Sequence, residues 1–262
     1  NEFAILTQAR DAGVTQTVTS EKLNTALPAT VRDPEGHWFA LTRRARVIYA
    51  SKARVSDTAI TYEQLADPKW KGKICMRSGQ HTYNVALTAA MIAHLGSANA
   101  EAWLRGVKAN LARKPSGGDR EAVRDVHSGL CDLAIGNTYY MGAMLKHSEQ
   151  KTWADSVKVL FPDANGRGTH VNISGMALAA NAPNRTNAIQ LMEFLVSAPA
   201  QKLYAETNHE YPAAIGITES DLVKSWGALK PDALPLPEIA KLRRQASEMI
   251  DRVRFDQGPG GS

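Results

Sequence analysis

The sequence has few of the residues on which enzymes and small metal proteins most often depend. It holds two cysteines in 262 residues, Cys75 and Cys131, and no C-x-x-C pair. Its seven histidines lack the spacing of zinc ligands, and no G-x-S-x-G, H-E-x-x-H or glycine-rich phosphate loop occurs. No stretch approaches the roughly 18 apolar residues of a membrane span, and no charged-then-apolar signal segment opens the chain. These absences argue against a zinc site, the common hydrolase classes and a membrane protein.

The composition that remains is that of an ordinary globular protein. Hydrophobic residues make up 44% of the chain and charged residues 22%, which is enough to bury a sizeable core. The net charge of +5 comes from 31 Lys and Arg against 26 Asp and Glu. These basic residues are spread along the chain without interleaved aromatics, so the sequence does not favour a nucleic-acid partner.

Predicted strands and helices alternate along the chain. We expect strands at 37–51, 73–78, 131–137, 157–162 and 172–180, and helices at 60–73, 82–96, 99–111, 117–129, 139–150, 184–208 and 237–255. This order predicts an α/β fold with a parallel sheet, in which ligands bind beyond the carboxyl ends of the strands. Two strand-to-helix turns stand out there, RSGQHTYN (77–84) and GNTYYMGA (136–143).

Three tyrosines lie at these two turns. Tyr139 and Tyr140 fall in the first turn of a predicted helix that Asn137 or Thr138 can cap; they diverge there by only about 100° and can converge on one point. Tyr83 begins the other helix. Phenolate is a hard oxygen donor that suits Fe³⁺, so the three tyrosines are candidate ferric ligands. The simpler alternative is that they are ordinary core or surface residues without a binding role.

The turn before Tyr83 also has an anion-binding pattern. Ser78 and Gly79 lie in a small-residue turn before a helix, where backbone N–H groups can bind an anion.

Four segments carry a resemblance to a known family. They are GHWFALTRRARVIYASKARV, ITYEQLADPKWKGKICMRSGQHTYN, GDREAVRDVHSGLCDLAIGNTYYMG and QKLYAETNHEYP. Together they resemble the periplasmic ferric-ion-binding proteins of ABC iron importers, in order and from about residue 10 to 256. The resemblance implies a two-lobed, type II-like periplasmic-binding-protein fold with no enzymatic activity. It also implies Fe³⁺ ligation by Tyr83, Tyr139 and Tyr140, and delivery to a permease and its ATPase in the periplasm.

Other features follow from the same resemblance. Residues 45–50 and 170–179 match the segments that cross between lobes, so one lobe is expected at 50–170 and a discontinuous lobe at 1–49 plus 171–262. Arg43, Arg44 or Arg46 either face the cleft and balance phenolate charge or lie on the surface, and Asn137 is a further candidate beside the site. Carbonate, phosphate or water is the expected co-ligand, with Ser78 and Gly79 as its candidate holders. A same-fold protein that binds a small organic anion or another metal is the alternative.

The sequence departs from the family at its opening. Family members begin with a strand, a helix and a second strand that have no counterpart before residue 10. We therefore expect the discontinuous lobe to lack one βαβ unit, which a segment on another chain can supply. The tail GPGGS has the composition of a flexible linker, with 260–262 as its end.

The two cysteines are either buried thiols or one disulfide. Given the resemblance, an oxidising periplasm favours a disulfide between Cys75 and Cys131. Neighbouring parallel strands can place their Cα atoms about 5–6 Å apart, as a disulfide requires. Two buried thiols on non-adjacent strands remain the alternative.

Overall fold

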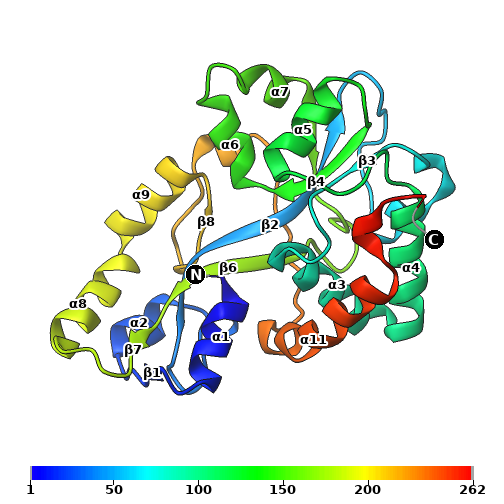
Figure 1. Cartoon of the computed structure of the whole chain (residues 1–262). Coiled ribbons are helices and arrows are strands. Elements are labelled where there is room, and N and C mark those ends of the chain that lie inside the picture. Colours follow the sequence, from blue (N-terminus) through cyan, green and yellow to red (C-terminus); the bar gives the residue numbers. More distant parts are fainter. Residues whose placement is uncertain (1, 261–262) are drawn as a thin grey trace. The chain divides into compact units, whose positions relative to one another are not determined.

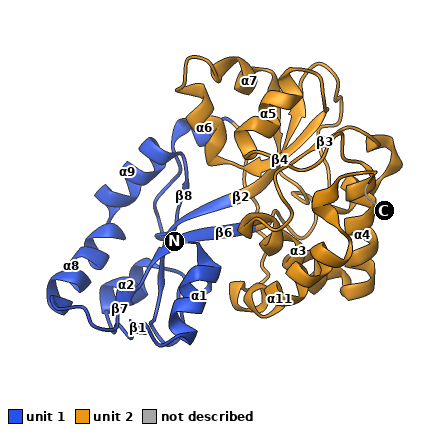
Figure 2. Ribbon diagram, in the orientation of Figure 1, with its two compact units in different colours: residues 1–44, 171–225 blue, residues 45–170, 226–262 orange. Residues whose placement is uncertain are grey.

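The structure is a computed structural model that describes residues 2–260. It forms two compact units, shown in different colours in Figure 2. Unit 1 comprises residues 1–44 and 171–225, and unit 2 comprises residues 45–170 and 226–262. Asn1 and residues 261–262, which include most of the predicted linker end, lie outside the described residues.

The unit boundaries correct the predicted lobes at the C-terminal end. Residues 226–262 belong with 45–170 and not with the discontinuous unit, because α11 (Leu236–Arg252) packs along α3 (Thr82–Leu95). The turn before α3 also packs closely against this C-terminal segment. A Cβ added at Gly79 would lie 2.9 Å from Ile250 and 2.8 Å from Phe255. The first boundary also falls at residue 44 instead of 49.

Unit 2 contains the helices and strands that carry the predicted tyrosine site (Figure 1). Its helices are α3, α4 (Ser97–Ala109), α5 (Asp119–His127), α6 (Tyr139–Leu145), α7 (Lys151–Asp155) and α11, with short 3-10 helices at Glu63–Ala66, Pro68–Trp70 and Phe255–Gln257. Its strands are β3 (Ile74–Cys75), β4 (Leu133–Asn137) and β5 (Val157–Leu160), together with the second half of β2 (Phe39–Ser51).

The sheet of unit 2 is mixed, which corrects the expected parallel sheet. Its order is β3-β4-β2-β5; β3 and β4 are parallel, but β2 runs antiparallel to β4 and to β5. A parallel pair needs a long crossover, and helices α3 to α5 provide one between β3 and β4. No such crossover sets the direction of β2, because this strand continues directly from unit 1.

Unit 1 is built around the first half of β2, which pairs with β6 (Val171–Met176) and with β8 (Tyr211–Pro212). A separate two-stranded sheet joins β1 (Thr15–Gln16) to β7 (Leu178–Ala179). The helices of this unit are α1 (Phe3–Asp11), α2 (Glu21–Ala26), α8 (Arg185–Leu195), α9 (Ala198–Asn208) and α10 (Asp221–Lys224), with a 3-10 helix at Ala29–Val31. The sequence did not predict α1, which buries Phe3, Ala4 and Leu6.

The core of unit 2 is tightly packed where β4 pairs with β2. All five residues of β4 are buried, and Gly136 faces the ring of Tyr49 on the neighbouring strand. The Tyr49 hydroxyl donates to the carbonyl of Asn137 at 2.6 Å, immediately before the turn that carries the tyrosine pair.

Gly136→Ala should destabilise unit 2. The new Cβ would lie 2.5 Å from Tyr49 Cε2 and 3.2 Å from Asp119 Cβ, so the ring or the strand must move. Overpacking of this kind costs about 1–3 kcal/mol. Urea unfolding should show this loss, and an unchanged midpoint would mean that the Tyr49 ring moves aside freely.

A buried histidine gives unit 2 a defined response to acid. His170 is fully buried; its backbone N–H donates to the Tyr62 hydroxyl at 3.2 Å, and its carbonyl accepts from the N–H of Arg46 at 3.0 Å. Burial lowers the pKa of His170 from 6.5 to about 4, and the positive charges of Arg46, His94 and Arg243 act in the same direction. Asp232 opposes them.

We expect the free energy of unfolding to fall as the pH drops from 7 to 4. At pH values between about 4 and 6.5, His170 is protonated in the unfolded chain but neutral in the folded protein, because its pKa is near 6.5 unfolded and near 4 folded. Acid therefore favours unfolding. The effect of this one group is about 3 kcal/mol. His170→Gln should remove this part of the acid sensitivity in urea titrations at several pH values. Equal pH slopes for the variant and the wild type would contradict the assignment.

Candidate functional site

The turn after β3 positions Tyr83 at the start of α3. His81 caps this helix, and its Nδ1 accepts the backbone N–H of Tyr83 at 3.3 Å. The rings of His81 and Tyr83 meet edge to face, with centroids 4.4 Å apart. The cap fixes where the helix begins, so Tyr83 lies in its first turn as the sequence predicted.

The turn after β4 positions the tyrosine pair in the same way. Tyr139 and Tyr140 are the first two residues of α6, and Thr138 is the residue before the helix. The Thr138 side chain does not cap the helix; its hydroxyl accepts the backbone N–H of Ala45 at 3.3 Å, which ties the turn to β2.

The two turns bring tyrosine hydroxyls together. The Oη atoms of Tyr83 and Tyr139 lie 3.2 Å apart, and the rings of Tyr139 and Tyr140 are 4.3 Å apart at a 36° tilt. All three side chains are half-buried. Burial raises the pKa of Tyr139, and hydrogen bonding to the Tyr140 and Tyr83 hydroxyls raises it further. Without a cation, Tyr139 therefore remains a neutral phenol in this cluster.

Two guanidinium groups flank the ring of Tyr83. The Arg46 Cζ lies 5.7 Å from the ring centroid and the Arg77 Cζ 5.3 Å, both in the range of cation–π attraction. Burial lowers the pKa of His81 to about 4, and the charge of Arg77 adds to the effect, so His81 is neutral near pH 7. The sequence does not point to Arg77, because a single arginine before a turn carries no distinctive pattern.

The donors of the predicted anion site at Ser78 and Gly79 bind a carboxylate of the chain itself. The Ser78 hydroxyl donates to Asp256 Oδ2 at 2.5 Å, and the Gly79 N–H donates to Asp256 Oδ1 at 2.6 Å. The turn does bind a carboxylate, as its donors suggested, but that carboxylate comes from the chain itself. A free anion there would have to displace Asp256.

Comparison with known proteins identifies the family of the chain. Residues 4–232 match the model of a family described as bacterial extracellular solute-binding protein. The chain is 42% identical over 255 residues to "Iron uptake protein A1" of Synechocystis, covering 96% of this chain and 71% of the relative. The chain belongs to the ferric-iron-binding branch of the bacterial solute-binding proteins.

Solved structures agree with this assignment. The "Bordetella ferric binding protein" is 52% identical, with a TM-score of 0.91 over 97% of this chain and 82% of that one. A Trichodesmium structure described as a complex with iron and citrate is 40% identical, with a TM-score of 0.93 over 97% of this chain and 81% of that one. The fold is therefore the α/β periplasmic-binding-protein fold of ferric-binding proteins, a family of solute binders and not of enzymes.

In this solute-binding protein, the other predicted site residues have defined partners. Asn137, two residues before Tyr139, accepts from Arg46 through Oδ1 at 3.2 Å and donates its backbone N–H to Asp119 Oδ2 at 2.9 Å. Arg43 and Arg44 belong to unit 1. There Arg43 donates to the carbonyl of Pro212 at 3.1 Å, and Arg44 donates to Ser174 and lies 4.0 Å from Glu210. A role for these two arginines at the tyrosines stays a prediction.

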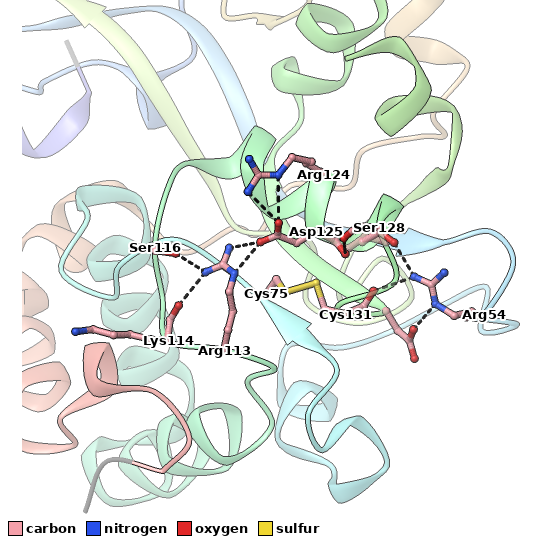
Figure 3. Close-up of a disulfide and its surroundings, with 11 residues drawn as sticks. Arg54, Cys75, Arg113, Lys114, Ser116, Arg124, Asp125, Ser128 and Cys131 are labelled. Atoms are coloured by element: carbon pink, nitrogen blue, oxygen red, sulfur yellow. Dashed lines mark hydrogen bonds and ion pairs between the residues drawn. A yellow bond between two sulfur atoms is a disulfide. The ribbon is translucent and has the colours of Figure 1, made fainter. Parts of the chain in front are cut away.

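A disulfide joins Cys75 of β3 to Cys131, just before β4, with Cα atoms 5.9 Å apart (Figure 3). Nearby, Arg54 donates to the carbonyl of Cys131 at 2.9 Å, and Arg113 binds Asp125 at 2.5 Å. The bridge thus links the two neighbouring strands that precede the Tyr83 and Tyr139 turns.

Residues 2–260 hold neither a carboxylate, histidine or cysteine metal site nor a membrane-spanning helix. Within that range, no group of three or more His, Cys, Asp and Glu side chains is arranged to hold a metal ion. Over the same residues, none of the helices has the length and apolar character that crossing a membrane demands.

Proposed function

We propose that the chain binds Fe³⁺ through the phenolates of Tyr83, Tyr139 and Tyr140 and delivers it to an ABC permease and its ATPase from the periplasm. The approach of the Tyr83 and Tyr139 hydroxyls to 3.2 Å, at the starts of two helices, is the observation that supports it most strongly. Two oxygens bound to one ion can be separated by at most about twice a 2 Å bond, and this pair already meets that limit.

Charge and hardness favour a ferric cargo. Phenolate oxygens suit hard cations, and a trivalent charge lowers the pKa of tyrosine hydroxyls enough for them to ionise on binding. The first turns of α3 and α6 add partial positive charge, which favours phenolate over phenol. Three phenolates leave further positions on the ion open, and carbonate, phosphate or water fills them in this proposal. The iron-related names of the Synechocystis and Bordetella relatives support the same cargo.

Reduction of the loaded protein tests this function. Fe³⁺ added to the purified protein should give a red or orange charge-transfer colour that dithionite bleaches, because only a ferric–phenolate site loses its colour on reduction. A colourless protein that binds a small organic anion or another metal instead would overturn the proposal.

We further propose that unit 1 is completed by a segment outside residues 1–262. The chain covers only 82% of the Bordetella protein, which leaves part of that fold without a counterpart. Unit 1 also carries an apolar groove of about 510 Å³ between α8 and α9. Phe194 and Leu203 line it and are 58% and 65% exposed. Such exposed apolar surface is typical of an interface.

Co-production tests this completion. The part of the Bordetella relative that this chain does not match, made as a separate chain, should co-purify with residues 1–262, and Leu203→Glu should prevent this. Leu130→Glu, at a 48% exposed leucine of unit 2, is the control and should leave co-purification intact. Failure to associate, or self-association of the chain through the same groove, would contradict the proposal.

A further inference from the structure

One buried side chain bonds to both tyrosine-bearing turns. Arg46, on β2, is only 2% exposed. Its Nη2 donates to Asn84 Oδ1 at 2.7 Å, and its Nη1 donates to Asn137 Oδ1 at 3.2 Å. Asn84 directly follows Tyr83, and Asn137 lies two residues before Tyr139. A single guanidinium therefore spans the two segments whose hydroxyls must meet.

The partner of this guanidinium is Asp119, the first residue of α5. Its carboxylate accepts from Arg46 Nη1 at 2.5 Å and from the backbone N–H of Asn137 at 2.9 Å, and Arg77 Nη1 lies 3.5 Å away. The Asp119 side chain is fully buried. Both arginines that pair with it also flank the ring of Tyr83. Asp119 thus fixes two groups beside Tyr83 and the backbone before Tyr139.

A buried ion pair does not by itself mark a functional role. Replacing such pairs by apolar residues is often neutral or stabilising, so stability alone is weak ground for placing one here. The residues that the pair contacts are better evidence for a role at the site than the pair itself. Its hydrogen bonds reach residues close to the tyrosines on both turns. Asn84 continues the link through Nδ2, which donates to the carbonyls of Arg77 and Ser78 at 3.2 and 2.9 Å.

We propose that Arg46 and Asp119 are positioning residues that hold Tyr83 within reach of the ion bound by Tyr139 and Tyr140. This inference rests on the proposed ferric site. A shift of about 1 Å in a positioned group can cost 10²-fold in function, and a ferric ion tolerates little more separation between its oxygens. Without the guanidinium fork, α3 and the β4–α6 turn lose their common anchor, and Tyr83 is the tyrosine that drops out.

The test compares bound iron in Arg46→Met, Arg46→Lys and Asp119→Asn with the wild type. The readouts are the absorbance of the charge-transfer band per bound Fe³⁺ and the ferric affinity measured by competition with citrate. We expect the band to fall to that of Tyr83→Phe and the affinity to weaken by about 10–100-fold, as for other residues that orient metal ligands. Arg46→Lys should rescue little, because an ammonium group cannot reproduce the planar fork.

Arg113→Met is the matched control. It breaks another Arg–Asp pair of unit 2, at 2.5 Å to Asp125 of the same helix, away from the tyrosines. It should leave the band per iron unchanged even if it lowers the melting temperature. Should Arg46→Met not fold, Arg46→Lys and Asp119→Asn carry the same comparison.

The outcomes separate the two proposals. If the wild type forms a coloured ferric complex and the folded Arg46 and Asp119 variants keep its band and affinity, the positioning role is overturned and the ferric site stands. If the wild type forms no such complex, both fail.

Discussion

Tyr139→Phe should strongly weaken the coloured ferric complex and leave the fold intact. Tyr139 is the central member of the cluster, because it hydrogen-bonds to Tyr83 and contacts the ring of Tyr140. Its phenolate would contribute a full negative charge at bonding distance from a trivalent ion in a partly desolvated site, where charges attract far more strongly than in water. The loss of affinity should therefore exceed the roughly 10–100-fold typical of residues that only orient a ligand.

The measurement is a citrate competition titration followed at the charge-transfer band, with circular dichroism to check the fold. Tyr140→Phe should behave like Tyr139→Phe. Tyr204→Phe, on α9 of unit 1, is the matched control and should leave iron binding unchanged. Tyr62→Phe is a poor control, because the Tyr62 hydroxyl donates to the carbonyl of Arg46 at 2.5 Å and accepts from His170. Equal losses for Tyr139→Phe and Tyr204→Phe would refute the tyrosine site.

The part of the site that the sequence predicted is the part that local rules determine. A strand, a short turn and a helix start can be recognised within ten residues, and this placed Tyr83 and Tyr139 in first helical turns. That neighbouring turns of one sheet can share a ligand is also a general rule. The Tyr83 and Tyr139 hydroxyls lie close together because both residues lie in first helical turns and because the strands before them are neighbours in one sheet.

The features that the sequence did not predict depend on contacts between distant segments. Asp256 lies 177 residues from Gly79, and nothing in the RSGQ turn signals that its donors are already bound. The amphipathic pattern of α11 predicts a helix but does not tell which unit its apolar face covers. The sequence predicts only that Asp119 belongs to a helix, and its pairing with Arg46, 73 residues away, follows from the packing of α5 against β4.

The direction of β2 was missed for a related reason. β2 is the first strand of its sheet along the chain, so no crossover from an earlier strand of that sheet fixes its direction, and its buried residues look the same in both directions. Antiparallel pairing places Arg46 opposite Asn137, at the end of β4 that leads to the tyrosine pair. In a parallel arrangement the same strand would run the other way along β4, and the guanidinium would not lie opposite this turn.

Reduction of the disulfide should lower the free energy of unfolding more than the other changes proposed here. It should leave the tyrosine cluster in place. Cys75 and Cys131 are 56 positions apart in the sequence, and in the chain-entropy account a loop of this size contributes about 4 kcal/mol by restricting the unfolded chain. Comparing oxidised and reduced forms of the same iron-free protein in urea isolates this effect, because no side-chain volume is removed, as it would be in alanine variants.

The bridge joins the last residue of β3 to Cys131, two residues before β4 begins, so on β4 it lies at the end away from the Tyr139 turn. The folded reduced protein keeps the hydrogen bonds of β3 and β4 and the Arg46–Asp119 pair. We therefore expect Cys75→Ala/Cys131→Ala, loaded with Fe³⁺ below its unfolding transition, to show the wild-type charge-transfer band. Loss of the band in that folded variant would mean that the bridge positions the tyrosines, whereas equal urea midpoints for oxidised and reduced protein would mean that it does not restrict the unfolded chain. The pair of measurements thus separates stability from ligand geometry in one unit.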